Sequence, residues 1–208
     1  MGLRFTAIDD LERPDHYYLT PGDKCIFLRE YTARAGYQKG ETNDLILNFK
    51  KSVDRKGRAE WRYKEIALWQ IASEFRQAMG EKWISQWTFV PIPPSKCKTD
   101  PLYDDRISRM LNEMTKGIRS DVRELIQQSG SMAAAHESDD RPSPERIARF
   151  YEVDEELADP EPKSIALVDD ILTTGAHFKA AEKVLEGRFP NAFIIGVFVA
   201  RRVPEPFA

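Results

Sequence analysis

The segment that most constrains the fold of this chain covers residues 164–178, with the sequence SIALVDDILTTGAHF. Its apolar run does not alternate with polar residues, which is typical of a strand buried on both faces of a parallel sheet. Two adjacent aspartates, Asp169 and Asp170, follow this run, and a Thr-Thr-Gly turn then leads into a helical pattern. Since ligands of such sheets bind beyond the carboxyl ends of the strands, we expect the aspartates to lie at a functional edge.

Strands and helices alternate along the rest of the chain, which predicts an α/β fold with a doubly wound, mostly parallel sheet. Further strands are expected at residues 24–33, 87–93, 122–126, 149–153 and 192–200. The clearest helix covers residues 60–79, and shorter helical segments are expected from residue 41, after Asp104 or Asp105, and after Gly175.

The chain of 208 residues is expected to form one domain. We assign residues 1–40 to a small N-terminal hood and residues 41–202 to the core. Residues 127–145 are polar and contain glycine, serine, aspartate and two prolines, so they are expected to form a flexible loop.

The charge balance restricts the partners of the protein. With 31 basic and 34 acidic residues, the net charge of -3 argues against a general grip on nucleic acid or on anionic lipid. Cys25 and Cys97 form no Cys-x-x-Cys pair, which argues against a structural zinc site. No apolar run approaches the length of a membrane span, so we expect a cytoplasmic protein without a membrane partner.

The turn after the aspartates has the chemistry of a phosphate site. Exposed backbone N–H groups and the helix dipole favour an anion at a helix N-terminus, and glycine allows the backbone to approach it closely. A ribose 5-phosphate fits both groups, because its hydroxyls can donate to the carboxylates of Asp169 and Asp170, which also help to hold a hard cation. The residues expected at the phosphate are Thr173, Thr174, Gly175, Ala176 and His177.

These residues carry a family resemblance. The sequence IALVDDILTTGA closely resembles the loop that binds phosphoribosyl pyrophosphate (PRPP) in type I phosphoribosyltransferases. The sequence FVPIPPSKCK resembles the strand and basic loop of the ComF-like branch of that superfamily, named for a role in DNA-uptake competence. The resemblance covers roughly residues 41–202. It implies transfer of the phosphoribosyl group from PRPP to an acceptor, with Mg²⁺ and with release of pyrophosphate. A homodimer is also implied, since type I relatives are commonly dimers.

The resemblance also implies roles for individual residues. The carboxylates of Asp169 and Asp170 would hold the ribose and, through PRPP, the Mg²⁺ ion. Arg141 and Arg146 would reach the departing pyrophosphate from the flexible loop, which makes them catalytic candidates beside the aspartates. The expected pyrophosphate-binding residues are Pro94, Ser95, Lys96 and Lys50.

The chain departs from the family in several places. It has no N-terminal zinc ribbon, and His177 stands where the loop usually has threonine or serine. Thr173 stands where purine-salvage enzymes have an aspartate, so the acceptor is not identified. Aromatic residues of the N-terminal part of the chain that could stack on the acceptor are Tyr31, Tyr37 and Trp61.

Two other functions and one purely structural interpretation remain open. The protein could be a non-catalytic sensor of PRPP or of a nucleotide, or an accessory protein associated with DNA uptake. The two aspartates could also be solvated, or could only cap a helix.

Overall fold

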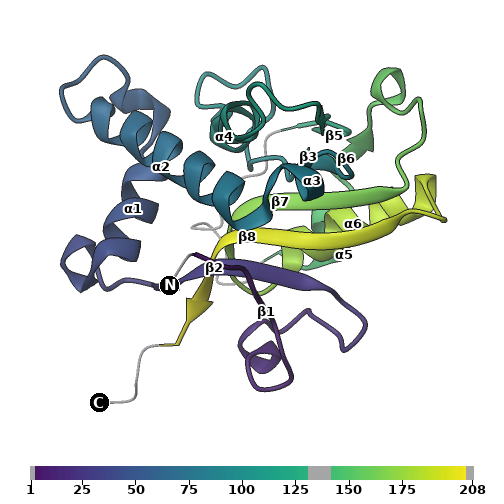
Figure 1. The fold of residues 1–208 in the computed structure, drawn as a ribbon, viewed down its shortest axis with the longest axis horizontal. Coiled ribbons are helices and arrows are strands. Elements are labelled where there is room, and N and C mark those ends of the chain that lie inside the picture. Colours follow the sequence, from purple (N-terminus) through teal and green to yellow (C-terminus); the bar gives the residue numbers. More distant parts are fainter. Residues whose placement is uncertain (1–2, 131–141, 205–208) are drawn as a thin grey trace.

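The computed structural model of the protein describes residues 3–130 and 142–204, which form a mixed α/β fold around a six-stranded sheet (Figure 1). The strand order is β1-β2-β8-β7-β3-β4, and every neighbouring pair is parallel except β1 with β2. The mostly parallel sheet predicted from the sequence is therefore confirmed. Its strands are β1 (Thr6–Ala7), β2 (Cys25–Thr32), β3 (Thr88–Pro91), β4 (Asp121–Val122), β7 (Ser164–Leu172) and β8 (Phe193–Val203).

Six α-helices are present in the described residues. They are α1 (Glu41–Phe49), α2 (Trp61–Met79), α3 (Glu81–Ile84), α4 (Arg106–Met114), α5 (Pro144–Ala148) and α6 (Ala176–Arg188). The long helix predicted at residues 60–79 is confirmed as α2, and it ends at Gly80, whose φ of 75° lies in the left-handed region that suits glycine.

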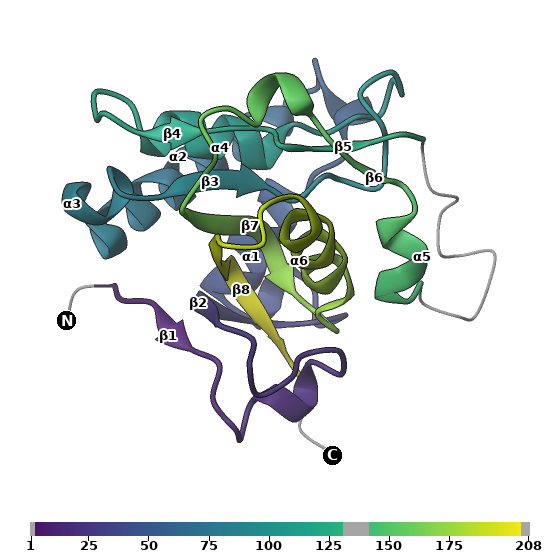
Figure 2. The same cartoon turned by 90° about the vertical axis from the view of Figure 1, so that its right-hand side faces the viewer.

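Two hydrophobic clusters cover the two faces of the sheet. Neighbouring residues of a strand point to opposite faces, and in β7 Leu167 belongs to one cluster while Val168 belongs to the other. The first cluster contains Phe178 and Leu185 of α6, and the second contains Leu68 of α2. Helix α5 packs against α6 (Figure 2). The apolar character of β7 on both faces follows from this double cover.

The N-terminal segment is part of the main sheet. The strand predicted at residues 24–33 is β2, which lies between β1 and β8 and pairs in parallel with β8, for example Phe27 with Phe198. Residues that we assigned to a hood thus supply an inner strand of the sheet that carries the core. The expected boundary at residue 40, between hood and core, therefore does not separate two structural units.

Two of the predicted strands differ from the structure in their bounds or in their place in the sheet. Residues 122–126 do not form one strand: they hold the end of β4 and the start of β5 (Ile126–Gln128), which belong to different sheets. The strand predicted at residues 149–153 is β6 (Tyr151–Val153), and it pairs antiparallel with β5 outside the main sheet. The expected flexible loop, 127–145, begins inside β5 and ends inside α5, and its central residues, 131–141, lie outside the described residues.

Candidate functional site

The candidate site lies where β3 and β7 end at the same edge of the sheet. The two strands are parallel neighbours, with Pro91 opposite Val168, so the chain leaves both in the same direction. The segment after β3 leads to α4, and the turn after β7 leads to α6. This is the edge at which open α/β sheets bind ligands.

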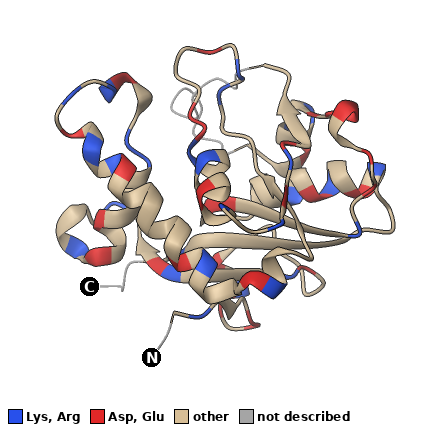
Figure 3. Ribbon diagram, turned by 45° about the horizontal axis from the view of Figure 1, so that its top comes forward, with Lys and Arg blue, Asp and Glu red and all other residues tan. Residues whose placement is uncertain are grey.

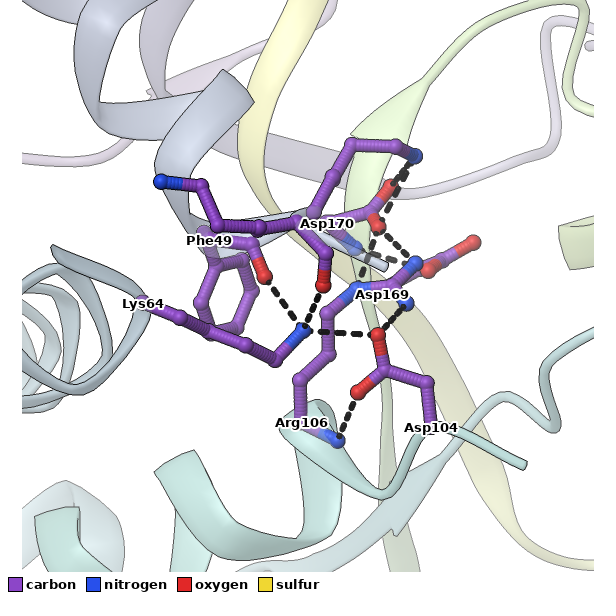
Figure 4. A network of polar contacts seen from close by, with 8 residues as sticks. Phe49, Lys64, Asp104, Arg106, Asp169 and Asp170 are labelled. Carbon is purple, nitrogen blue, oxygen red and sulfur yellow. Dashed lines mark hydrogen bonds and ion pairs between the residues drawn. The ribbon is translucent and has the colours of Figure 1, made fainter. Parts of the chain in front are cut away.

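Asp170 is the centre of a buried network of charges (Figure 4). Its side chain is 4 % exposed, and its two oxygens accept hydrogen bonds from Lys50 Nζ at 2.9 and 3.0 Å. Arg106 donates to the same carboxylate through Nε, at 2.9 Å, and through a second nitrogen of its guanidinium group. Although burial acts to raise the pKa of Asp170, Lys50 and Arg106 hold it below the usual range, so the carboxylate stays ionised.

The network continues from Arg106 to the interior. Arg106 donates to Asp104 at 2.8 Å, and the same Asp104 oxygen accepts from Lys64 Nζ at 2.7 Å. Lys64 Nζ also donates to the backbone carbonyls of Phe49 and Lys51, both at 2.9 Å, and its side chain is 1 % exposed. Burial lowers the pKa of Lys64, and the three acceptors compensate for the loss of water around its ammonium group.

Sequence reasoning missed Lys64 and Arg106. A signal for Lys64 existed, because it lies three and four residues before Ala67 and Leu68, on the stripe that α2 buries. A lysine in an apolar stripe needs a buried partner. Asp104 also contacts the start of α4, because its second oxygen accepts the backbone N–H of Arg106 at 3.2 Å.

Asp169 has a different environment from its neighbour. Asp169 is among the residues that line a pocket, and its Oδ1 accepts the backbone N–H of Asp170 at 2.7 Å. Burial raises the pKa of Asp169 to about 7, and the negative charge of Asp170 acts in the same direction. The two adjacent aspartates therefore do different things: Asp170 anchors cations, and Asp169 presents its side chain to the pocket.

The pocket lies between the segment after β3, the start of α4 and β5. It contains about 500 Å³ of empty space, including the open solvent at its mouth. Of the residues predicted to bind pyrophosphate, Pro94 and Lys96 line it. Ser95 is exposed and its carbonyl accepts from Gln128 Nε2 at 2.7 Å, whereas Lys50 contacts Asp170 instead.

The 173–177 turn opens α6 with Gly175 in the left-handed region, at a φ of 83°. The first N–H groups of a helix have no acceptor within the helix, so this turn offers donors to a ligand. The N-terminal segment holds the carbonyl side of the turn: His16 Nδ1 donates to Thr173 O at 2.5 Å, and the Tyr18 N–H donates to Thr174 O at 2.9 Å. Leu19 packs against Gly175.

His177 and Tyr151 form a contact that the sequence does not indicate. His177 follows Ala176 in the first turn of α6, and its Nδ1 lies 3.0 Å from the hydroxyl oxygen of Tyr151. Burial lowers the pKa of His177 and raises that of Tyr151, so both side chains are uncharged at neutral pH.

Other predicted residues are not brought to the pocket or lie outside the described residues. Arg146 is exposed on α5, which packs against α6, and it is not among the residues that line the pocket. Arg141 lies outside the described residues. The aromatic residues expected around an acceptor do not line the pocket either; they are Tyr31, Tyr37 and Trp61.

In residues 3–130 and 142–204, no group of three or more His, Cys, Asp or Glu side chains is arranged to hold a metal ion. None of the helices in these ranges combines the length and the apolar character needed to cross a bilayer. Comparison with protein-family models and with curated proteins gives no match for this chain.

Proposed function

We propose that the protein binds PRPP and transfers its phosphoribosyl group to an acceptor, with release of pyrophosphate. The observation that carries this proposal is the difference between the two aspartates. Asp169 faces a pocket at the carboxyl end of β7, and the next turn along the chain, at residues 173–177, opens a helix through a left-handed glycine. A carboxylate and, four residues further along the chain, a helix N-terminus offer partners for the hydroxyls and the phosphate of one ribose 5-phosphate.

In this proposal the two aspartates have separate roles. Asp169 accepts hydrogen bonds from the ribose hydroxyls, and the 173–177 turn takes the 5-phosphate. Asp170 does not contact the ribose but orients Lys50 and Arg106, to which it is already bonded. This refines the expectation from the sequence, in which both carboxylates hold the sugar.

The side chains fit Mg²⁺ only as part of a complex with PRPP. Four acidic residues line the pocket, Asp104, Asp105, Glu124 and Asp169, but in the described residues no three acidic, histidine or cysteine side chains are grouped to hold a metal ion. The diphosphate and water would therefore supply most of the six oxygens that the cation takes. When bound, the ion would neutralise charge on the pyrophosphate. Asp169 would be the residue that holds it, together with the ribose hydroxyls.

In the proposed reaction the protein forms no covalent bond to the substrate. The acceptor's lone pair forms a bond to C1 of the ribose, and the bond from C1 to the pyrophosphate oxygen breaks with its electron pair on that oxygen. Positive charge builds on the sugar, where the Asp169 carboxylate stabilises it, and negative charge builds on the pyrophosphate, where Lys96 and Lys50 stabilise it.

One observation favours the sensor as second candidate. The two lysines expected to bind pyrophosphate are already paired with carboxylates of the protein. Lys50 contacts Asp170, and Lys96 Nζ lies 3.6 Å from an Asp100 oxygen. A protein that only senses PRPP would break these internal ion pairs and form new ion pairs between the lysines and the ligand. The accessory role with DNA has less support, because basic and acidic residues are interspersed over the ribbon and form no single-sign stripe in that view (Figure 3).

Calorimetry with PRPP and Mg²⁺ tests the binding proposal. Asp169→Asn should weaken binding about 10- to 100-fold, as expected for the loss of a charged hydrogen-bond acceptor. Asp44→Asn, on the exposed side of α1, is the matched control and should bind normally. Wild-type protein that fails to bind PRPP, or an Asp169→Asn variant with unchanged affinity, would refute the proposal.

Pyrophosphate release separates the enzyme from the sensor. PRPP and Mg²⁺ are incubated with the protein and a panel of nucleobases and amines, and pyrophosphate is measured. Release that depends on one class of acceptor and that Asp169→Asn abolishes supports transfer. Tight binding of PRPP without release over the whole panel supports the sensor.

A further inference from the structure

Tyr151 is a buried polar residue to which the proposed reaction gives no role. It lies at the start of β6, in the small second sheet, and is 5 % exposed. Strand β6 packs against α6, and the Tyr151 hydroxyl oxygen lies 3.0 Å from His177 Nδ1. The contact joins residues 26 positions apart, so the tertiary structure places this hydroxyl beside the 173–177 turn.

The protonation states decide what this hydrogen bond does. Burial raises the pKa of Tyr151, and the charge of Asp169 adds to the effect, so the phenol keeps its proton. Burial lowers the pKa of His177; Asp170 acts in the opposite direction and Lys50 acts with burial. A neutral imidazole has one N–H donor and one bare nitrogen that accepts.

The direction of the hydrogen bond follows from the surroundings of the phenol. Among the described residues, His177 is the only hydrogen-bond partner of the Tyr151 hydroxyl. If His177 Nδ1 were the donor, the phenol proton would be buried without an acceptor, which is unfavourable. The phenol therefore donates to Nδ1, and the imidazole proton is on Nε2.

We propose that Tyr151 is a positioning residue that fixes His177 as an uncharged Nε2–H donor to the phosphate bound in the 173–177 turn. His177 is only partly buried, so a ligand can reach it. Its position in the first turn of α6 places it among backbone N–H groups that lack acceptors within the helix. The chain thus replaces the usual hydroxyl donor of such a turn with an imidazole whose tautomer another residue sets. This inference rests on the proposed function, because that function places a phosphate in the turn.

The first test reads the tautomer in the full-length protein without ligand. Long-range ¹H–¹⁵N correlation spectra distinguish the two nitrogens of His177. The wild type should have its proton on Nε2, and Tyr151→Phe should shift His177 toward a mixture of tautomers. Tyr63→Phe, on the exposed side of α2, is the control and should leave the spectrum unchanged. A wild-type His177 with its proton on Nδ1 would overturn the inference.

The second test measures affinity for PRPP with Mg²⁺ and for inorganic phosphate. Tyr151→Phe should weaken both about two- to tenfold, the range expected for one neutral hydrogen bond. In a His177→Thr background the same change should have no further effect, because a hydroxyl donor does not need Tyr151. If Tyr151→Phe weakens binding equally in both backgrounds, its role is structural and the inference is overturned.

The two proposals fail in distinguishable ways. If phosphate binds and responds to Tyr151→Phe while PRPP does not bind, the proposed function is wrong and the positioning role stands. If PRPP binds with an affinity that Tyr151→Phe does not change, the positioning role is wrong and the proposed function stands. If neither ligand binds the wild type, both are overturned.

Discussion

Replacing Lys64 by methionine should destabilise the protein strongly, because Lys64 is a buried cation with three acceptors. Its Nζ donates to Asp104 at 2.7 Å and to the Phe49 and Lys51 carbonyls at 2.9 Å each. Lys64→Met removes one of the two cations bonded to Asp104, the other being Arg106, and leaves two carbonyls without this donor. Breaking a buried ion pair costs about 3–5 kcal/mol, and the apolar methionine offsets part of this, so we expect a loss of about 3 kcal/mol.

Urea unfolding of the full-length protein, followed by circular dichroism, measures this loss. With a slope of about 2 kcal/mol per molar urea, the midpoint should fall by about 1.5 M. Lys183→Met is the matched control: Lys183 is an exposed lysine of α6, and its replacement should change the free energy of unfolding by less than about 0.5 kcal/mol. If Lys64→Met were as mild as this control, the ammonium group would not be held as described, and the reasoning on the network would be refuted.

Two further predictions concern the turn and the aspartates. Gly175→Ala should cost about 1–2 kcal/mol of unfolding free energy, because its φ is 83° and an added Cβ would lie 3.0 Å from Leu19 Cδ2. Adding Leu19→Ala, with the Leu19→Ala single variant as reference, should relieve only the contact, and a fully additive double variant would contradict this. The pKa of Asp169, raised from 3.8 to about 7, means that the folded state keeps a proton that the unfolded state has lost between these pH values. The free energy of unfolding should therefore fall as pH rises through this range, by at most about 1.4 kcal/mol per pH unit, and Asp169→Asn should remove this contribution. A difference between wild type and variant that does not change with pH would contradict the assignment.

Local patterns were enough to predict most elements of the core. Apolar residues at helical spacing predicted α2, and the unbroken apolar run predicted β7. Strand positions near the second sheet were predicted less well. Period-two patterns identify a strand but do not say which strand it pairs with, so the pairing of β6 with β5 in a separate sheet was not predicted.

The sequence alone determined the chemistry of residues 164–178, because a strand, two carboxylates, a glycine turn and a helix are all encoded within fifteen neighbouring positions. Only the tertiary structure decided what each group contacts. Asp170 meets Lys50 and Arg106, which are 120 and 64 positions away, so it anchors cations while its neighbour Asp169 faces the pocket. His177 likewise meets Tyr151 across 26 positions. Such contacts depend on how helices and strands pack against one another in space. A local periodicity in the sequence does not contain that information.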